Sequence, residues 1–369
     1  MIRRRHVFAP AAALFAAAAR AANPGEALRK AMLEAVESKQ IPGAVVVVRE
    51  KGRNVVEEAA GWAVIEEKRP MRVGDIFMIA SSTKPFSATT IMTLVDRGEL
   101  RLDDPVRKFY PEFAGSSDIR QLLSHTSGLF GNDAPREVVE PIRNFDRPLR
   151  DAVSLIVKAP LAYEPGTKFS YGGASFCVAA GIAEKITGQD FEQYMRKVLL
   201  EPLGMRETQF RSAVDLSPRV PQIYKRRKGG GFEPVPAVME LPGRRGPRPD
   251  GFVLAAGGLY ATAGDAVRFL EMHLNDGESN GKRILSQESV RAMQARQTGA
   301  AGEEYGLGWR RMEFDASGQV VVFGHGGAYG TQLIVDKRRG LVAAIFTQMP
   351  SGESAKFLSA ARAAVAREA

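Results

Sequence analysis

Residues 79–85 read Ile79-Ala80-Ser81-Ser82-Thr83-Lys84-Pro85, and no other stretch says as much about the fold and chemistry of this chain. Ser81 and Lys84 are three residues apart, a spacing that puts two side chains on one helix face, about 5–6 Å apart at Cβ. A serine hydroxyl is a poor nucleophile until a neighbouring base takes its proton. Desolvation can bring the pKa of a lysine amine to about 7–8, where it works as a base. The spacing therefore predicts a nucleophile, Ser81, paired with a general base, Lys84.

The sequence around Ser81 separates this match from a chance one. The same Ser-x-x-Lys pattern recurs at Ser279–Lys282, but in a turn-rich run where nothing would hold a base over a serine. Residues 77–80 form an apolar approach to Ser81, and an apolar-rich helix is predicted from Lys84 onward. Pro85 fits only in the first turn of that helix, where its missing N–H costs nothing. Ser81 is thus expected at a helix N-terminus, which also favours developing negative charge.

The first 22 residues have the pattern of a secretory signal peptide. Arg3–Arg5 form a basic start, Val7–Ala19 form an apolar stretch, and Ala19–Ala21 offer an Ala-x-Ala cleavage site. The apolar stretch is too short to span a bilayer as an anchor of the mature protein. We therefore expect a bacterial protein that is exported, periplasmic or secreted, without a stable membrane anchor. Cleavage would lower the formal net charge from +9 to +5, because four arginines leave with the peptide.

The composition argues against several classes of protein. The chain has 369 residues, of which 44% are hydrophobic and 25% charged, as in ordinary globular proteins. Its single cysteine, Cys177, rules out an intramolecular disulfide and is expected to be a buried, unreactive thiol. The four histidines lack the paired spacing of metal ligands and no glycine-rich phosphate loop occurs, so neither a metal nor a cofactor is expected. The basic stretch 225–251 lacks the interleaved aromatic residues that stack on bases, which favours a surface loop or hairpin over a nucleic-acid site.

Hydrophobic patterning predicts a sheet built from both ends of the chain. Strands are expected at 43–49, 55–64, 307–312, 319–323, 331–336 and 341–347. Helices are expected at 27–38, 84–97, 119–123, 148–157, 175–187, 191–200, 263–274, 286–294 and 354–367. We expect one domain of the α+β class over 23–369. Its sheet lobe, about 23–78 and 303–369, would be flanked by the two terminal helices, and a mostly helical lobe, about 79–302, would be inserted between the halves.

Two further segments offer groups for catalysis. Tyr171 follows a turn-rich lead-in and precedes Gly172-Gly173, so its hydroxyl is a candidate proton relay beside a Ser–Lys pair. The alternative is a tyrosine that packs at a helix start. The two glycines would let the backbone pass close to a ligand. His125, which follows the short helix 119–123, is interpreted as structural.

The second segment is Gly324-His325-Gly326-Gly327-Ala328, between two predicted strands. Glycine inside a strand often marks the close approach of another group to the backbone. An exposed N–H at Ala328 could pair with that of Ser81 to form an oxyanion hole. His325 could hydrogen-bond a substrate or cap a turn.

Seven short motifs follow one another along the chain. They lie at Ile79–Pro85, Leu122–Leu129, Phe169–Tyr171, Glu201–Met205, Ala256–Leu259, Tyr305–Trp309 and His325–Gly327. In order and spacing they resemble the serine hydrolases related to class C β-lactamases, D-alanyl-D-alanine carboxypeptidases and family VIII carboxylesterases. The resemblance implies a β-lactamase/penicillin-binding-protein-like catalytic domain with an antiparallel sheet. It also implies Ser81 as the acylated nucleophile, Lys84 and Tyr171 as general bases, and the Ser81 and Ala328 N–H groups as the oxyanion hole.

Two substrate-binding positions depart from that family's pattern. In the family the tyrosine opens a Tyr-x-Asn motif whose asparagine binds the substrate amide, and here Gly173 stands in its place. The third motif is typically Lys-Thr-Gly, whose lysine attracts a substrate carboxylate. Here it reads His325-Gly326-Gly327, as in the esterase-like branch. Both changes weaken recognition of a β-lactam or an acyl-D-alanine, whereas the acylating residues are retained.

The expected function is hydrolysis of a small-molecule ester or amide through an acyl-Ser81 intermediate, and it is closest to that of a carboxylesterase. A true class C-like β-lactamase or D,D-peptidase is the nearest alternative, with the missing amide supplied from elsewhere. A catalytically silent envelope-binding protein that kept the fold is a third hypothesis, which Gly173 makes conceivable.

Overall fold

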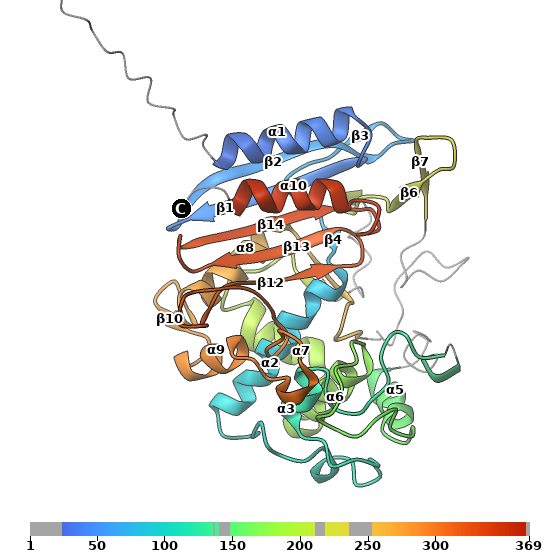
Figure 1. The fold of residues 1–369 in the computed structure, drawn as a ribbon, viewed down its shortest axis with the longest axis vertical. Helices are drawn as coiled ribbons and strands as arrows, with labels where there is room; N and C mark the ends of the chain where they lie inside the picture. The colour runs from blue at the N-terminus through green and yellow to red at the C-terminus, as the bar shows by residue number, and fades with distance from the viewer. Residues whose placement is uncertain (1–23, 136, 140–147, 211–217, 236–252, 367–369) are drawn as a thin grey trace, which may run out of the picture.

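The computed structural model describes residues 24–135, 137–139, 148–210, 218–235 and 253–366. The expected signal peptide at 1–22 lies outside these residues, and so does the part of the basic stretch beyond residue 235. The chain forms a sheet layer at one end of the molecule and a helical lobe at the other (Figure 1).

A seven-stranded sheet is drawn from both ends of the chain, and every strand pairing in it is antiparallel. Its order is β11-β12-β13-β14-β1-β2-β3. The strands are β1 (Gly43–Glu50), β2 (Arg53–Val64), β3 (Arg69–Pro70), β11 (Arg310–Phe314), β12 (Val320–Gly327), β13 (Thr331–Asp336) and β14 (Leu341–Thr347). Because β1 and β14 are neighbours, Val46 lies opposite Ile345 although the two are near opposite ends of the chain. The expected fold class is confirmed.

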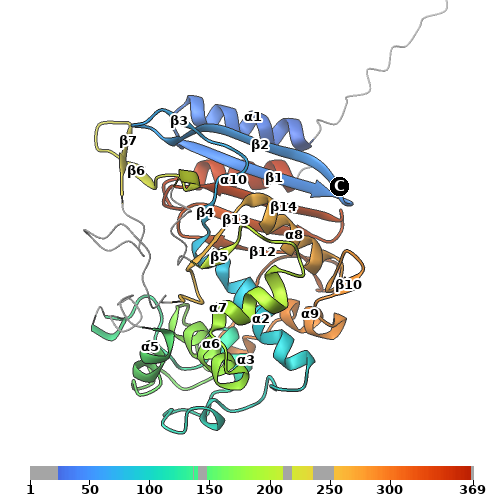
Figure 2. The same cartoon turned by 180° about the vertical axis from the view of Figure 1, so that it is seen from behind.

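Alternate side chains of β1 point to opposite faces of the sheet, and each face meets its own helices. Val46 packs with α1 (Pro24–Glu37) and α10 (Ala355–Ala366), which cover one face (Figure 1). Val45 belongs to the main core together with α8 (Ala263–Leu274), which lies on the other face (Figure 2). The sequence predicted α8 to lie in the inserted lobe, but this helix packs against β13 and β14. The sheet and the helical lobe therefore share one core.

The helical lobe contains a buried helix, α2 (Lys84–Asp96), whose residues from Lys84 to Leu94 are all buried. A helix that is apolar or small on every side is expected in such a position. The lobe also contains α3 (Ile119–Leu123), α5 (Leu149–Ile156), α6 (Ala174–Thr187), α7 (Phe191–Met195) and α9 (Gln287–Gln294). The helix expected at 191–200 changes after Met195 into a π-helical turn, Arg196–Leu200. Cys177 is buried in α6, and burial raises the pKa of its thiol to about 12, as expected for an unreactive cysteine.

Three short strands that the sequence did not indicate form a second sheet next to Ser81. β4 (Phe77–Met78) and β5 (Gln209–Phe210) both pair with β8 (Leu259–Ala261). Strands of two or three residues are too short for an alternating pattern to show. This small sheet holds the chain that leads into the Ser81 turn.

Two hairpins form in turn-rich stretches of the sequence. The start of the basic stretch forms β6 (Tyr224–Arg226) and β7 (Phe232–Pro234). The second Ser-x-x-Lys match spans the turn between β9 (Glu278–Ser279) and β10 (Lys282–Arg283), so it is not on a helix. In the described part of the chain, no helix combines the length and the apolar character needed to cross a bilayer.

Candidate active site

Ser81 lies in a short 3₁₀ turn, Ala80–Thr83, that leads directly into α2. Pro85 occupies the first turn of that helix, as the sequence indicated. Ala80 has a φ of 46°, a left-handed conformation that is unfavourable for alanine and persists only where surrounding contacts impose it. Ser81 is partly exposed, whereas the residues on either side of it are buried. The turn thus presents one hydroxyl to solvent from an otherwise buried segment.

The large sheet also contributes contacts that fix this turn. The Thr331 hydroxyl on β13 donates to the Ile79 carbonyl at 2.9 Å. The Ser82 hydroxyl donates to the His325 carbonyl on β12 at 3.3 Å. Both hydroxyls are buried, so each bond would be expensive to break. The Ser81 turn and the end of β12 are therefore held against one another.

Lys84 is only 2% exposed and lies beneath Ser81. Its ammonium donates to the Ser81 hydroxyl oxygen at 3.2 Å and to the Ala256 carbonyl at 2.9 Å. It also lies 4.4 Å from the ring centre of Tyr171 and 5.8 Å from that of Phe176. No carboxylate of the described residues forms an ion pair with Lys84. In its neutral form the same amine is placed to accept the Ser81 proton.

Tyr171 lies on the chain that enters α6 and is held there by neighbouring backbone. Its carbonyl accepts a hydrogen bond from the Asn132 N–H at 2.9 Å. A Cβ on Gly172 would lie 2.9 Å from the Gly131 Cα, a close approach that requires glycine. Gly173 is the N-cap of α6 with φ −90° and ψ −26°, a right-handed conformation that asparagine also adopts readily. Backbone conformation alone would thus admit the asparagine that the family pattern has there.

The end of β12 approaches the Ser81 turn through residues without side chains. A Cβ on Gly327 would lie 2.2 Å from the Ile79 carbonyl oxygen and 2.2 Å from Thr331 Oγ1, so only glycine fits. A Cβ on Gly326 would come closest to the flexible end of Gln332, at 3.0 Å, and would meet no backbone atom under 3.6 Å. Of the two glycines, Gly327 is the one that sets the separation of strand and turn.

Two backbone N–H groups, of Ser81 and Ala328, border this approach. Ala328 is exposed directly after β12, and Ser81 is partly exposed in its turn. No described residue accepts a hydrogen bond from either N–H. Donors left open beside a nucleophile are what a tetrahedral oxyanion requires. The oxyanion hole at these two groups remains a prediction, and the structure is compatible with it.

The His325 side chain is 1% exposed, and both of its ring nitrogens have partners. Nδ1 lies 2.8 Å from the Gly326 carbonyl oxygen, which can only accept, so this nitrogen carries the proton. Nε2 then accepts from the Tyr305 hydroxyl at 3.1 Å. Burial, assisted by the charge of Lys84, holds the pKa of His325 well below its ordinary value, so the imidazole is neutral. Here the ring supports Tyr305; its predicted contact with substrate stays a prediction.

Arg310 is a site residue that the sequence reasoning did not single out. It begins β11, is exposed, and places its guanidinium carbon 5.3 Å from the Tyr171 ring centre and 5.8 Å from that of Tyr305. It forms no ion pair with any described residue. The site therefore has a cation at its edge although His325 is neutral. Its place directly after the Tyr305–Trp309 motif was the only signal in the sequence, because its position near Tyr171 depends on the pairing of Arg310 with Gly324 of β12.

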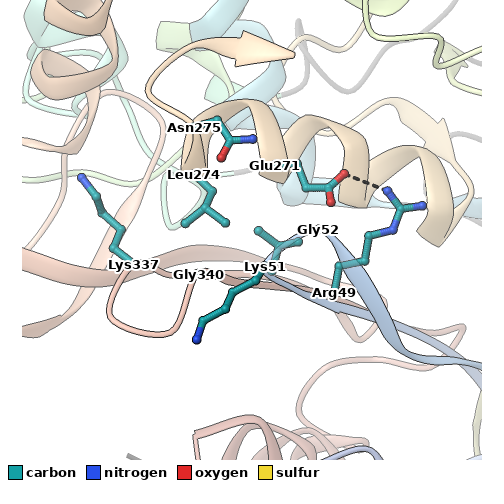
Figure 3. Close-up of a pocket in the computed structure, with 9 residues that line it drawn as sticks. Arg49, Lys51, Gly52, Glu271, Leu274, Asn275, Lys337 and Gly340 are labelled. Carbon is teal, nitrogen blue, oxygen red and sulfur yellow. Dashed lines mark hydrogen bonds and ion pairs between the residues drawn. The ribbon is translucent and has the colours of Figure 1, made fainter. Parts of the chain in front are cut away.

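A surface pocket of about 490 Å³ lies elsewhere, between the β1–β2 turn, the end of α8 and the β13–β14 turn (Figure 3). Arg49 and Glu271 form an ion pair of 2.8 Å across it, and Lys51 and Lys337 also line it. None of the residues discussed above lines this pocket, so we do not assign the reaction to it. Among the described residues, no group of three possible metal ligands comes together.

Comparison with known proteins identifies the family. A family model described as Beta-lactamase matches residues 28–367. The chain belongs to the β-lactamase family. Esterase EstB from Burkholderia gladioli is 31% identical to it over 352 residues, which cover 85% of this chain and 88% of EstB. Penicillin-binding protein 4 from Amycolatopsis lactamdurans is 31% identical over 83% of this chain and 81% of its own length.

The fold of this β-lactamase-family protein is also that of solved relatives. EstCE1, described as a hydrolase with promiscuous acyltransferase activity, superposes with a TM-score of 0.81 at 24% identity, over 93% of this chain and 98% of that one. The protein is a serine hydrolase. Since the named relatives include both an esterase and a penicillin-binding protein, the bond that is cleaved has to be argued from the site.

Proposed function

We propose that this serine hydrolase is an exported, carboxylesterase-like enzyme that cleaves ester or small amide bonds through an acyl-Ser81 intermediate. The observation that carries the proposal is the 3.2 Å contact between Lys84 Nζ and Ser81 Oγ at the start of a buried helix. An esterase that is 31% identical over most of both chains supports an ester substrate. Export rests on the signal peptide predicted at 1–22.

Acylation begins when the neutral Lys84 amine takes the Ser81 proton and Oγ attacks the substrate carbonyl carbon. The N–H groups of Ser81 and Ala328 hold the resulting oxyanion. When the tetrahedral intermediate collapses, the Tyr171 hydroxyl gives its proton to the leaving alcohol or amine, and the Lys84 ammonium returns a proton to the tyrosine oxygen. In deacylation a water proton passes through Tyr171 to Lys84, the water oxygen attacks the acyl carbon, and Ser81 leaves with the proton from Lys84.

The preference for esters over β-lactams follows from two positions. A β-lactam presents a carboxylate and a side-chain amide, but Gly173 has no side chain and His325 carries no charge. One good hydrogen bond to a charged group contributes about 1.5–3 kcal/mol, or a factor of about 10–150. We therefore expect kcat/KM for nitrocefin to be at least about tenfold below that for a short p-nitrophenyl ester. Gly173→Asn combined with His325→Lys should narrow the gap in a folded variant.

The direct test is intact-mass analysis after reaction with a fluorophosphonate probe. The wild type should gain one adduct on Ser81, and Ser81→Ala should lose both the adduct and the hydrolysis of p-nitrophenyl acetate. Ser279→Ala is the matched control, because this serine belongs to the second Ser-x-x-Lys match in the β9–β10 hairpin and should react like the wild type. A folded Ser81→Ala variant that still forms the adduct would overturn the proposal.

A β-lactamase or D,D-peptidase is the second candidate, and Arg310 is the observation that favours it. Its guanidinium has no partner carboxylate among the described residues and lies next to Tyr171. If it binds a substrate carboxylate, Arg310→Met should lower kcat/KM for nitrocefin at least about tenfold and that for a neutral ester less than about threefold. Should the wild type turn over nitrocefin faster than the ester, this candidate replaces the esterase.

A further inference from the structure

His125 occupies an unusual position directly behind Tyr171. It follows α3 with a φ of 62°, a left-handed conformation that few residues other than glycine, asparagine, aspartate and histidine adopt. Its side chain is fully buried. Aromatic rings surround it, with ring centres at 4.6 Å (Tyr171), 5.1 Å (Tyr305), 5.2 Å (Phe176) and 5.6 Å (Phe169). A polar ring in such a place needs a reason beyond filling space.

Both residues next to Tyr171 donate a hydrogen bond to His125. The Ser170 N–H donates to the His125 carbonyl at 2.9 Å. The Gly172 N–H donates to His125 Nδ1 at 3.5 Å. Because the His125 backbone is left-handed, its carbonyl oxygen and its side-chain Nδ1 both face the segment 170–172. Together with the Asn132 bond on the other side, these contacts fix the chain immediately before and after the tyrosine.

The Gly172 contact also sets the tautomer of the ring. Because Nδ1 accepts, the proton is on Nε2, and that nitrogen is buried with no hydrogen-bond partner in the described part of the chain. Burial lowers the pKa of His125 far below its ordinary value, and the charges of Lys84 and Arg310 act in the same direction. The ring is therefore a neutral acceptor. An unpartnered buried N–H is unfavourable, so the arrangement is kept at some expense of stability.

We propose that His125 is a positioning residue for acyl transfer, because it fixes the Tyr171 ring beside Lys84. The inference rests on the proposed function, in which Tyr171 relays the proton to the leaving group. Lys84 Nζ lies 4.4 Å from the tyrosine ring centre, so a small displacement of the 170–172 segment changes the path of that proton. A misplacement of about 1 Å can cost about 10²-fold in rate.

Three substitutions separate positioning from packing. His125→Asn keeps the left-handed backbone and an acceptor where Nδ1 stands, whereas His125→Gln places its acceptor where Nε2 stands. His125→Gly keeps only the backbone conformation. We expect kcat for p-nitrophenyl acetate to fall about 10- to 100-fold in the Gly and Gln variants with KM changed less than about threefold. The Asn variant should recover most of that loss.

Repeating the substitutions in a Tyr171→Phe background separates positioning from packing. A packing role would give the same loss of kcat with or without the tyrosine hydroxyl. If His125 acts through Tyr171, His125→Gly should lower kcat less than about threefold there. Losses of equal size in both backgrounds, or an Asn variant as slow as Gln, would overturn the proposal. Should His125→Gly not fold, the Asn and Gln pair decides in the same two backgrounds.

Hydrogen exchange of the peptide 169–173 provides a readout that does not depend on ester turnover. Its exchange should quicken in the Gln variant and not in the Asn variant, and equal exchange in both would overturn the positioning of this segment. A wild type that neither hydrolyses esters nor takes the fluorophosphonate refutes the proposed function, while the exchange result still decides whether His125 holds Tyr171.

Discussion

Gly327→Ala should displace the Ala328 N–H, one of the two predicted donors of the oxyanion hole. The added Cβ would lie 2.2 Å from both the Ile79 carbonyl oxygen and Thr331 Oγ1, and the first of these is a backbone atom at the start of the Ser81 turn. Overpacking of this kind typically costs about 1–3 kcal/mol of unfolding free energy. Relief requires the end of β12 to move away from the Ser81 turn, which takes the Ala328 N–H out of reach of the oxyanion. Losing one such donor lowers kcat by about 10²–10³-fold.

The neighbouring Gly326→Ala is the matched control, because its Cβ would meet only the flexible end of Gln332 within 3.5 Å, at 3.0 Å. The assay is kcat for p-nitrophenyl acetate, with thermal unfolding followed by circular dichroism in the same samples. We expect Gly326→Ala to stay within about threefold of the wild-type kcat and Gly327→Ala to lose about 100-fold while still folded. A folded Gly327→Ala variant with wild-type kcat would refute the oxyanion role of Ala328 and the contact argument behind it.

Three further predictions concern catalysis, pH and export. Lys84→Met and Tyr171→Phe should each cost a large factor in kcat and their combination little more, since they form one proton-transfer unit; additive losses would separate them. Burial holds the pKa of His273 at about 3 and the pKa values of His125 and His325 well below the ordinary value. Below about pH 6.5 the unfolded chain therefore binds more protons than the folded protein. As the pH falls further, each of these histidines should lower the unfolding free energy by up to about 1.4 kcal/mol per pH unit. Denaturant titrations at several pH values should show that the unfolding free energy of His273→Leu depends less steeply on pH than that of the wild type. Edman sequencing of protein recovered from the periplasm should begin at Ala22 or Asn23; an intact, full-length cytoplasmic product in the native host would contradict export.

The helices and central strands were predictable because their signals are local. The apolar pattern at 175–187 gives the helix Ala174–Thr187, and the run at 341–347 gives β14 with the same bounds. The strand expected at 319–323 instead runs from Val320 to Gly327. Its last two residues, Gly326 and Gly327, have low strand propensity, but they remain in the sheet because they pair with Gln332 and Thr331 of β13.

Tertiary contacts explain what the sequence reasoning missed in the site. The Ser–Lys spacing is local, and the structure places the two groups in contact. Arg310 and His125 are different, because both reach Tyr171 only through strand pairing or a turn conformation distant in sequence. The structural role assigned to His125 said nothing of which segment it would hold. No local pattern encodes that a left-handed residue after α3 will accept hydrogen bonds from the chain entering α6.

The place of β14 in the sheet has a consequence for how the enzyme comes into being. This strand lies between β13 and β1, so it is central although it is the last strand of the chain. Pairings between such remote segments close large loops and form slowly. During synthesis β1 has no partner on that side until Thr347 has emerged, and its Val-rich edge stays open. The Ser81 turn is also held by hydrogen bonds to β12 and β13, so an incompletely synthesised chain that lacks these strands has no complete site. We therefore expect hydrolytic activity to appear late in folding, so that an assay of activity regained on refolding would report the closing of this sheet.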